Sequence, residues 1–158
     1  MIVKKILQQS QTFDIIIDDG SHKSSDVVRS FAHYFPYLTK NGIYLVEDLH
    51  CSYWGVYEGG LYNPLSSISF FKRLVDISNY EHWRNNKLRG NLLSRFSEEY
   101  DIEFSEFDLS TLHSVEFINS LCILKKSFSD KNELGKRIVV GRDELVASGS
   151  KELNGKSV

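Results

Sequence analysis

The sequence predicts an α/β fold in which a helix joins two parallel strands, and three observations support this. Residues 13–18 (FDIIID) and 43–46 (IYLV) are short, mainly apolar segments without strict alternation, as expected of parallel strands that helices cover on both faces. A helical pattern lies between them, and the loops around it are short. Such a unit makes the strands parallel and the crossover right-handed.

The helix between the two strands begins and ends at recognisable signals. Ser24 or Ser25 is expected to cap its start, and residues 40–42 its end, with Gly42 in a left-handed conformation. Its apolar stripe consists of Val27, Val28, Phe31, Tyr34, Phe35 and Leu38.

Four further elements are predicted along the chain. Residues 2–10 carry apolar side chains at near-helical spacing and predict a short amphipathic helix. Residues 63–80 predict a capped helix, and residues 85–99 predict another. Two β-prone runs within residues 113–126 flank a turn at 119–120 and predict a hairpin.

The composition divides the chain into two parts. Residues 1–126 hold all the predicted elements and form one domain. Residues 127–158 are polar, with one apolar island at 138–140, and predict a partly disordered C-terminal segment.

The charge and the cysteines exclude some classes of partner. The net charge of -2 does not indicate binding to nucleic acid or to an anionic membrane. No apolar run approaches the ~18 residues of a membrane span. Cys51 and Cys122 form no C-x-x-C pair, and the N-terminus lacks the apolar run of a signal peptide, so a cytoplasmic location is expected.

Both predicted strands end in acids, at the sheet edge where open α/β folds bind ligands. Asp19 follows the first strand, and Glu47 and Asp48 follow the second. Neighbouring strands lie ~4.8 Å apart, so these carboxylates can converge on a hard cation such as Mg²⁺, with His22 over the same place.

An alternative interpretation is that the acids are ordinary residues of turns at strand ends. Successive residues of a regular strand also face opposite ways, so Glu47 and Asp48 share an ion only if the strand has already turned. The residues alone leave both interpretations open.

Three motifs carry a resemblance to a known family: IIDDGSH, then SFxxxFPYL, then NGIYLVEDLHCSYW. Together they resemble the C-terminal half of the class I S-adenosylmethionine-dependent methyltransferases, which have a Rossmann-like sheet. The resemblance is closer to the Mg²⁺-dependent O-methyltransferases of macrolide deoxysugars, of the mycinamicin sugar methyltransferase type. It runs from about residue 3 to about residue 126, and it implies that residues 1–126 are a partial methyltransferase domain that lacks the N-terminal cofactor-binding half.

The resemblance implies a role for each motif residue. Asp19, Glu47 and Asp48 match the metal ligands, and His22 matches the general base. Tyr53 and Trp54 match positions that line the sugar pocket, although an aromatic pair after a strand is often simply packed.

The function implied by the resemblance is methyl transfer from S-adenosylmethionine to a sugar hydroxyl of a glycosylated small molecule or glycan, with Mg²⁺ as the second cofactor. A cation holding two neighbouring oxygens lowers the pKa of the hydroxyl. An imidazole is then a suitable base at neutral pH.

The sequence departs from the family at its start. The glycine-rich cofactor turn and the acid for the ribose do not precede Phe13, so only Asp18 to Ser21 are in a position to touch the cofactor. A fragment, a chain completed by another polypeptide and a non-catalytic remnant are all compatible with this. The open edge of residues 13–18 predicts self-association or a partner that supplies the missing half, and a binding module that pairs through this edge is the alternative function.

Overall fold

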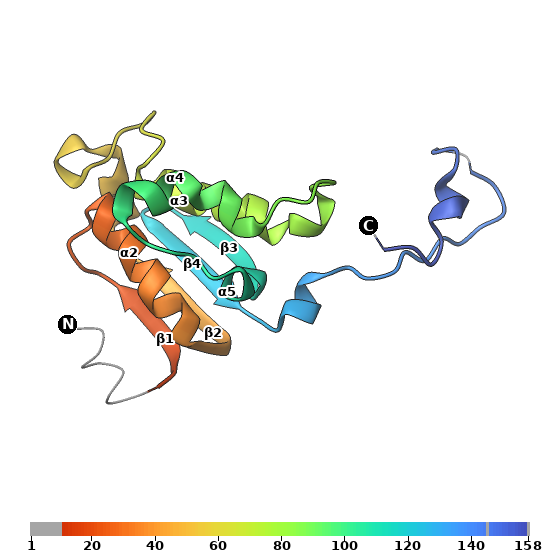
Figure 1. The fold of residues 1–158 in the computed structure, drawn as a ribbon, viewed down its shortest axis with the longest axis horizontal. Coiled ribbons are helices and arrows are strands. Elements are labelled where there is room, and N and C mark those ends of the chain that lie inside the picture. The colour runs from red at the N-terminus through yellow and green to blue at the C-terminus, as the bar shows by residue number, and fades with distance from the viewer. Residues whose placement is uncertain (1–10, 145, 158) are drawn as a thin grey trace.

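The computed structural model describes residues 11–144 and 146–157. Residues 13–126 form one four-stranded sheet with helices on one face (Figure 1). The strand order is β1-β2-β4-β3. β1 (Phe13–Asp18) runs parallel to β2 (Leu38–Val46), which is antiparallel to β4 (Leu121–Lys126). β3 (Leu112–Ile118) pairs with β4 as an antiparallel hairpin at one edge, and β1 forms the other edge.

Four α-helices are present in the described residues. They are α2 (Ser24–Tyr34), α3 (Ser67–Ser78), α4 (Ser94–Tyr100) and α5 (Glu106–Ser110), and short 3₁₀ turns join several of them. None of these helices is long and apolar enough to cross a membrane.

The core lies between the helices and one face of the sheet, and it is rich in aromatic side chains. Phe31 of α2 stacks on Phe35 at 4.7 Å between ring centroids and meets Tyr44 of β2 edge-on at 5.8 Å. Phe70 and Phe71 of α3 complete this cluster, and neither is exposed to solvent. The packing therefore fixes β2 against both α2 and α3.

The other face of β1 is open. The side chains of Ile15 and Ile17 are 62% and 58% exposed, whereas Ile16 packs against the core. The prediction that helices cover this strand on both faces is therefore wrong for the described residues. An all-apolar run indicates two-sided burial only when the covering elements are present.

The parallel strands, the helix before Asn79 and the hairpin are confirmed, but the helix after β1 ends early. α2 ends at Tyr34 and is followed by a 3₁₀ turn that contains Pro36, because proline has no N–H to continue the helix. β2 then begins at Leu38. The left-handed residue is Asn41, with φ of 66°, and not Gly42 as predicted.

The serine expected to cap α2 has another partner. Lys23 is the N-cap residue and makes no side-chain cap, whereas the buried Ser24 hydroxyl accepts a hydrogen bond from the Ser67 N–H at 2.9 Å. α3 has the predicted N-terminal cap, and the structure assigns it to Ser66, whose side chain accepts a hydrogen bond from the Ser69 N–H. The hydrogen bond between Ser67 and Ser24 ties the starts of α2 and α3 together.

Two other predicted segments differ from the structure or fall outside it. Residues 85–99 form a loop, a 3₁₀ turn and part of α4 in place of one helix. The helix predicted at 2–10 lies outside the described residues. The segment after β4 extends away from the sheet and includes a 3₁₀ turn at Ser150–Leu153 (Figure 1).

Candidate metal and acceptor site

The structure brings Asp19, His22 and Asp48 together at the carboxyl ends of β1 and β2. One ligand atom from each of the three side chains lies within 4.8 Å of the others. The His22 Nε2 atom is 3.9 Å from Asp48 Oδ2. These side chains converge because β1 and β2 are parallel, which places both carboxyl ends at the same edge of the sheet.

Two left-handed residues aim these side chains. Asp48 has φ of 50° and His22 has φ of 58°, so the chain turns sharply at each position. Ordinary residues adopt this conformation at a cost, and such residues cluster at functional sites. The turn at Asp48 releases its side chain from the alternation of β2.

Glu47 lies just before this turn and is not part of the three-residue cluster. Its backbone N–H donates a hydrogen bond to the Asp18 carbonyl at 3.0 Å and so extends the pairing of β1 and β2 by one residue. Its side chain is half-buried. The predicted role of Glu47 as a third carboxylate ligand stays a prediction.

The cluster is open to solvent on one side. The Asp48 side chain is 51% exposed and that of His22 is 22% exposed. A small ion or a hydroxyl group can therefore reach the carboxylates without any opening of the fold.

A second histidine, which sequence reasoning left without a role, stands on the other side of Asp48. His50 Nδ1 lies 2.6 Å from Ser120 Oγ in the hairpin turn and 3.8 Å from Asp48 Oδ1. Its position two residues after Asp48 was the available signal, because the 3₁₀ turn at Leu49–Tyr53 folds it back. His50 thus connects the cluster to the β3–β4 hairpin.

Aromatic side chains form a rim beside the cluster. Trp54 is 50% exposed and meets the His50 ring edge-on at 4.9 Å. Tyr57, not singled out from the sequence, lies 6.2 Å from the Trp54 ring and 6.3 Å from that of His22. Exposed aromatic faces beside polar groups are suited to stacking on a ring-shaped ligand.

Tyr53 lines a pocket whose lining includes neither His22 nor Asp48. This pocket, of about 270 Å³, is also lined by His50, Lys72 and residues 117–120 of the hairpin. His50 therefore stands between this pocket and the Asp48 carboxylate. The two aromatic residues predicted for one sugar pocket are thus divided between two neighbouring surfaces.

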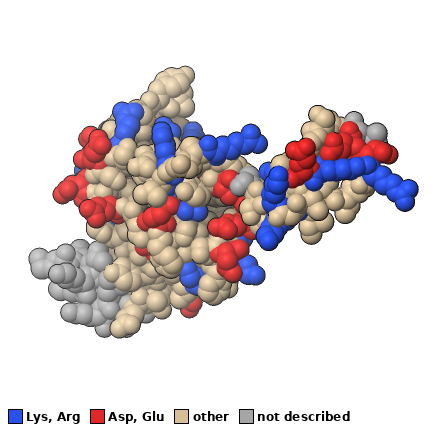
Figure 2. All heavy atoms as spheres, turned by 45° about the vertical axis from the view of Figure 1, so that its right-hand side comes forward, with Lys and Arg blue, Asp and Glu red and all other residues tan. Residues whose placement is uncertain are grey.

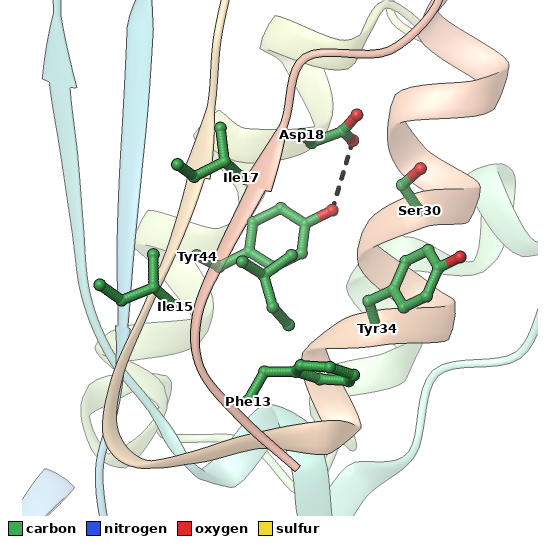
Figure 3. Close-up of a pocket in the computed structure, with 8 residues that line it drawn as sticks. Phe13, Ile15, Ile17, Asp18, Ser30, Tyr34 and Tyr44 are labelled. Carbon is green, nitrogen blue, oxygen red and sulfur yellow. Dashed lines mark hydrogen bonds between the residues drawn. The ribbon is translucent and has the colours of Figure 1, made fainter. Parts of the chain in front are cut away.

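Asp18, the last residue of β1, faces a separate pocket of about 290 Å³ between β1 and α2 (Figure 3). The Tyr44 hydroxyl donates a hydrogen bond to Asp18 Oδ2 at 3.3 Å. Burial raises the pKa of the Asp18 carboxyl, although hydrogen bonds from Tyr44 and Ser30 oppose this. Burial and the neighbouring carboxylate also raise the pKa of Tyr44 well above its ordinary value.

No protein-family model matches the chain, but curated enzymes resemble part of it. The 8-demethyl-8-alpha-L-rhamnosyl tetracenomycin-C 2'-O-methyltransferase of Streptomyces olivaceus is 50% identical over 64 residues, which are 40% of this chain and 17% of that protein. The mycinamicin VI 2''-O-methyltransferase of Micromonospora griseorubida is 38% identical over 76 residues, 46% of this chain and 19% of that protein. The chain thus spans about a fifth of these relatives' length.

Solved structures show the same fold. Two crystal forms of the MycE methyltransferase from the mycinamycin biosynthetic pathway, in complex with Mg and SAH, align with TM-scores of 0.67 and 0.69 at 22% and 23% identity. The alignments cover 89% and 94% of this chain but 34% and 35% of MycE. The predicted resemblance is therefore confirmed: part of the chain is similar in sequence to O-methyltransferases of rhamnosyl tetracenomycin-C and of mycinamicin VI, and its fold is that of about a third of the MycE methyltransferase.

Proposed function

We propose that this chain supplies the metal-binding and acceptor-binding part of a Mg²⁺- and S-adenosylmethionine-dependent O-methyltransferase that acts on a sugar hydroxyl of a glycosylated small molecule. The observation that carries the proposal is the convergence of Asp19, Asp48 and His22 at the carboxyl edge of two parallel strands. The similarity to enzymes that methylate rhamnosyl and mycinamicin sugars supports the acceptor class.

The donor set fits the proposed ion and the proposed base. Mg²⁺ prefers carboxylate and water oxygens to imidazole nitrogen. Asp19 and Asp48 would therefore hold the cation, with Glu47 as a further carboxylate at the same edge. His22, the one nitrogen donor of the cluster, is then available for another task.

The chemistry of the site follows from this division. Asp19 and Asp48 would hold the Mg²⁺ ion, and the bound ion would supply the positive charge that lowers the pKa of the reacting hydroxyl. The His22 imidazole, beside Asp48, would accept the hydroxyl proton as the methyl group is transferred. The same carboxylate then lies close enough to stabilise the imidazolium.

The aromatic rim is the proposed platform for the acceptor. Trp54 and Tyr57 present partly exposed rings between His50 and His22. A sugar stacked on them would present its hydroxyl groups to the neighbouring carboxylates. Tyr53 would contact a more distant part of the acceptor, from the pocket lined by Lys72.

Completion of the catalytic unit requires further polypeptide. The chain aligns with about a third of MycE, and β1, whose neighbour on one side is β2, is an edge strand among the described residues. We propose that a further segment or a separate chain provides the cofactor-binding half. A non-catalytic module that uses the β1 edge to bind a partner is the second candidate, and the exposed Ile15 and Ile17 favour it.

Titration calorimetry with MgCl₂ and MnCl₂ tests the metal site on the chain as it is. We expect weak binding that Asp48→Asn reduces at least tenfold, because one of the two converging carboxylates is lost. Asp130→Asn is the matched control, since Asp130 is exposed and lies outside the cluster. Equal binding by the Asp48 variant and the parent chain, or none by either, would remove the basis of the proposal.

A further inference from the structure

We infer that His50 is a positioning residue, held by the turn between β3 and β4, that fixes the Asp48 carboxylate and the Trp54 ring relative to each other. The inference rests on the proposed function, in which Asp48 holds the cation and Trp54 carries the sugar. The His50 Nδ1 atom is 3.8 Å from Asp48 Oδ1, and the His50 ring centroid is 4.9 Å from that of Trp54. One side chain therefore contacts both parts of the proposed site.

Ser120, in the turn of the hairpin, anchors this region twice. Its hydroxyl shares a hydrogen bond of 2.6 Å with His50 Nδ1, and its main-chain oxygen accepts a hydrogen bond from the Leu49 N–H at 2.9 Å. The turn is left-handed at Ser120, with φ of 69°. Two successive residues of the 3₁₀ segment are thus bonded to one residue of the hairpin, and side chains held in this way keep a single orientation.

The Asp48 carboxylate needs such support because its side chain is 51% exposed. Its Oδ2 atom lies 3.9 Å from His22 Nε2, and its Oδ1 atom lies 3.8 Å from His50 Nδ1, so each oxygen has an imidazole nitrogen nearby. Removal of a group that orients a metal ligand commonly lowers metal affinity by about 10- to 100-fold. The His50 contact is longer than a hydrogen bond and partly exposed, so a smaller effect is expected here.

The Trp54 side chain is 50% exposed, and the His50 ring meets it edge-on at an interplanar angle of 78°. The main chain also joins this residue to the cluster. The Trp54 N–H donates to the Cys51 carbonyl, and the Cys51 N–H donates to the Asp48 carbonyl, both at 2.9 Å. The main chain therefore sets where Trp54 lies, and the His50 ring sets the direction in which the indole points.

The arrangement is made within one part of the molecule. All of these contacts lie within residues 48–120. The C-terminal segment stands away from the sheet (Figure 2), and none of the contacts involves it. The hairpin turn and the 3₁₀ segment are therefore sufficient to position His50.

Time-resolved fluorescence anisotropy tests the contact with Trp54 and needs no metal. The chain has two tryptophans, so Trp83→Phe leaves Trp54 as the reporter in every variant. We expect His50→Ala to raise the amplitude of the sub-nanosecond anisotropy decay by about twofold, because exposed side chains change rotamer on this timescale. Ser120→Ala should raise it less. An unchanged decay in His50→Ala would overturn the inference.

His113→Ala is the matched control for both measurements. His113 lies on β3 of the same hairpin, and its Nδ1 atom is likewise within hydrogen-bond distance of a side-chain oxygen, at 2.8 Å from Asn132 Oδ1. Its removal should change neither the anisotropy decay of Trp54 nor Mg²⁺ binding. Equal effects of His113→Ala and His50→Ala would show a general loosening of the hairpin and would overturn the inference.

Titration calorimetry with MgCl₂ on the same full-length variants tests the contact with Asp48. We expect His50→Ala to weaken Mg²⁺ binding by about three- to tenfold. His50→Asn should restore the affinity to within about twofold of the parent, because its amide nitrogen can take the place of Nδ1 beside Ser120. The Trp54 ring should stay as mobile as in His50→Ala, since the imidazole ring is lost in both.

The two measurements separate this inference from the proposed function. If the parent binds Mg²⁺ and His50→Ala binds it equally well, the inference fails and the metal site stands. If the parent binds no Mg²⁺, the proposed function fails together with the role of His50 toward Asp48, and the anisotropy of Trp54 still decides whether His50 positions that ring.

Discussion

The Lys126 ammonium of β4 donates a hydrogen bond to the main-chain oxygen of Phe35 at 3.0 Å, although its side chain is only 3% exposed. A second bond goes to the Pro36 oxygen at 2.9 Å, and Asp108 Oδ1 lies 3.7 Å away. Burial lowers the pKa of Lys126, and the Asp108 carboxylate opposes this. A buried cation thus holds the turn that ends α2.

Replacement of this cation should destabilise the fold. Lys126→Met leaves the Phe35 and Pro36 oxygens without their donor, and we expect a loss of about 1–3 kcal/mol in the free energy of unfolding. Urea denaturation measures it. Lys125→Met is the matched control, because the neighbouring Lys125 is exposed, and it should be within about 0.5 kcal/mol of the parent. Similar losses for both variants would contradict the assigned role.

Cys122 should make stability sensitive to alkaline pH. Burial raises the pKa of its thiol from 9.0 to about 12. The unfolded chain therefore releases this proton first, and the contribution to stability that is complete below pH 9 is lost as the pH rises toward 12. The Cys122→Val variant lacks this loss. Thermal melts between pH 8 and 11 measure this. The melting temperature of the parent should fall relative to that of Cys122→Val as the pH rises, and a difference that stays constant would contradict the prediction.

Gly42 should tolerate no side chain. A Cβ atom there would lie 2.8 Å from Leu38 Cγ and 2.9 Å from the Asp14 and Thr39 carbonyl oxygens. We expect Gly42→Ala to cost about 1–3 kcal/mol through the strain on the β1–β2 pair. Gly55→Ala is the control, since nothing lies within 4 Å of its Cβ position. Chemical denaturation measures the free energy of unfolding of the two variants. Equal values would show that β1 and β2 can accommodate the added methyl group without strain, against the prediction.

His22 should separate metal binding from catalysis. If His22 is the base and the carboxylates hold the ion, His22→Gln should change Mg²⁺ affinity by less than about threefold while methyl transfer by the completed enzyme falls by about 10²–10⁴. Calorimetry measures the first quantity and a methyl-transfer assay the second. A tenfold loss of Mg²⁺ affinity in His22→Gln would make His22 a ligand.

The sequence predicted which residues meet at the site, but not the left-handed turn at Asp48 that separates Asp48 from Glu47. The positions of Asp19, His22 and Asp48 follow from acids and a histidine after two parallel strands, so their convergence was accessible from the pattern. The separate paths of Glu47 and Asp48 were not, because a left-handed turn at Asp48 depends on the packing of the 3₁₀ segment that follows. The link from His50 to Ser120 joins residues seventy positions apart, and no local signal encodes it.

The parallel β1–β2 unit, the capped helix α3 and the β3–β4 hairpin follow from the sequence, because local periodicity, caps and turn residues specify these elements. In contrast, the buried face of each strand and the partner of each buried polar group depend on tertiary packing. Ile15 and Ile16 are chemically identical, yet one is exposed and the other packs against the core. Burial depends on what lies across the sheet, and that information is held by residues distant in the sequence.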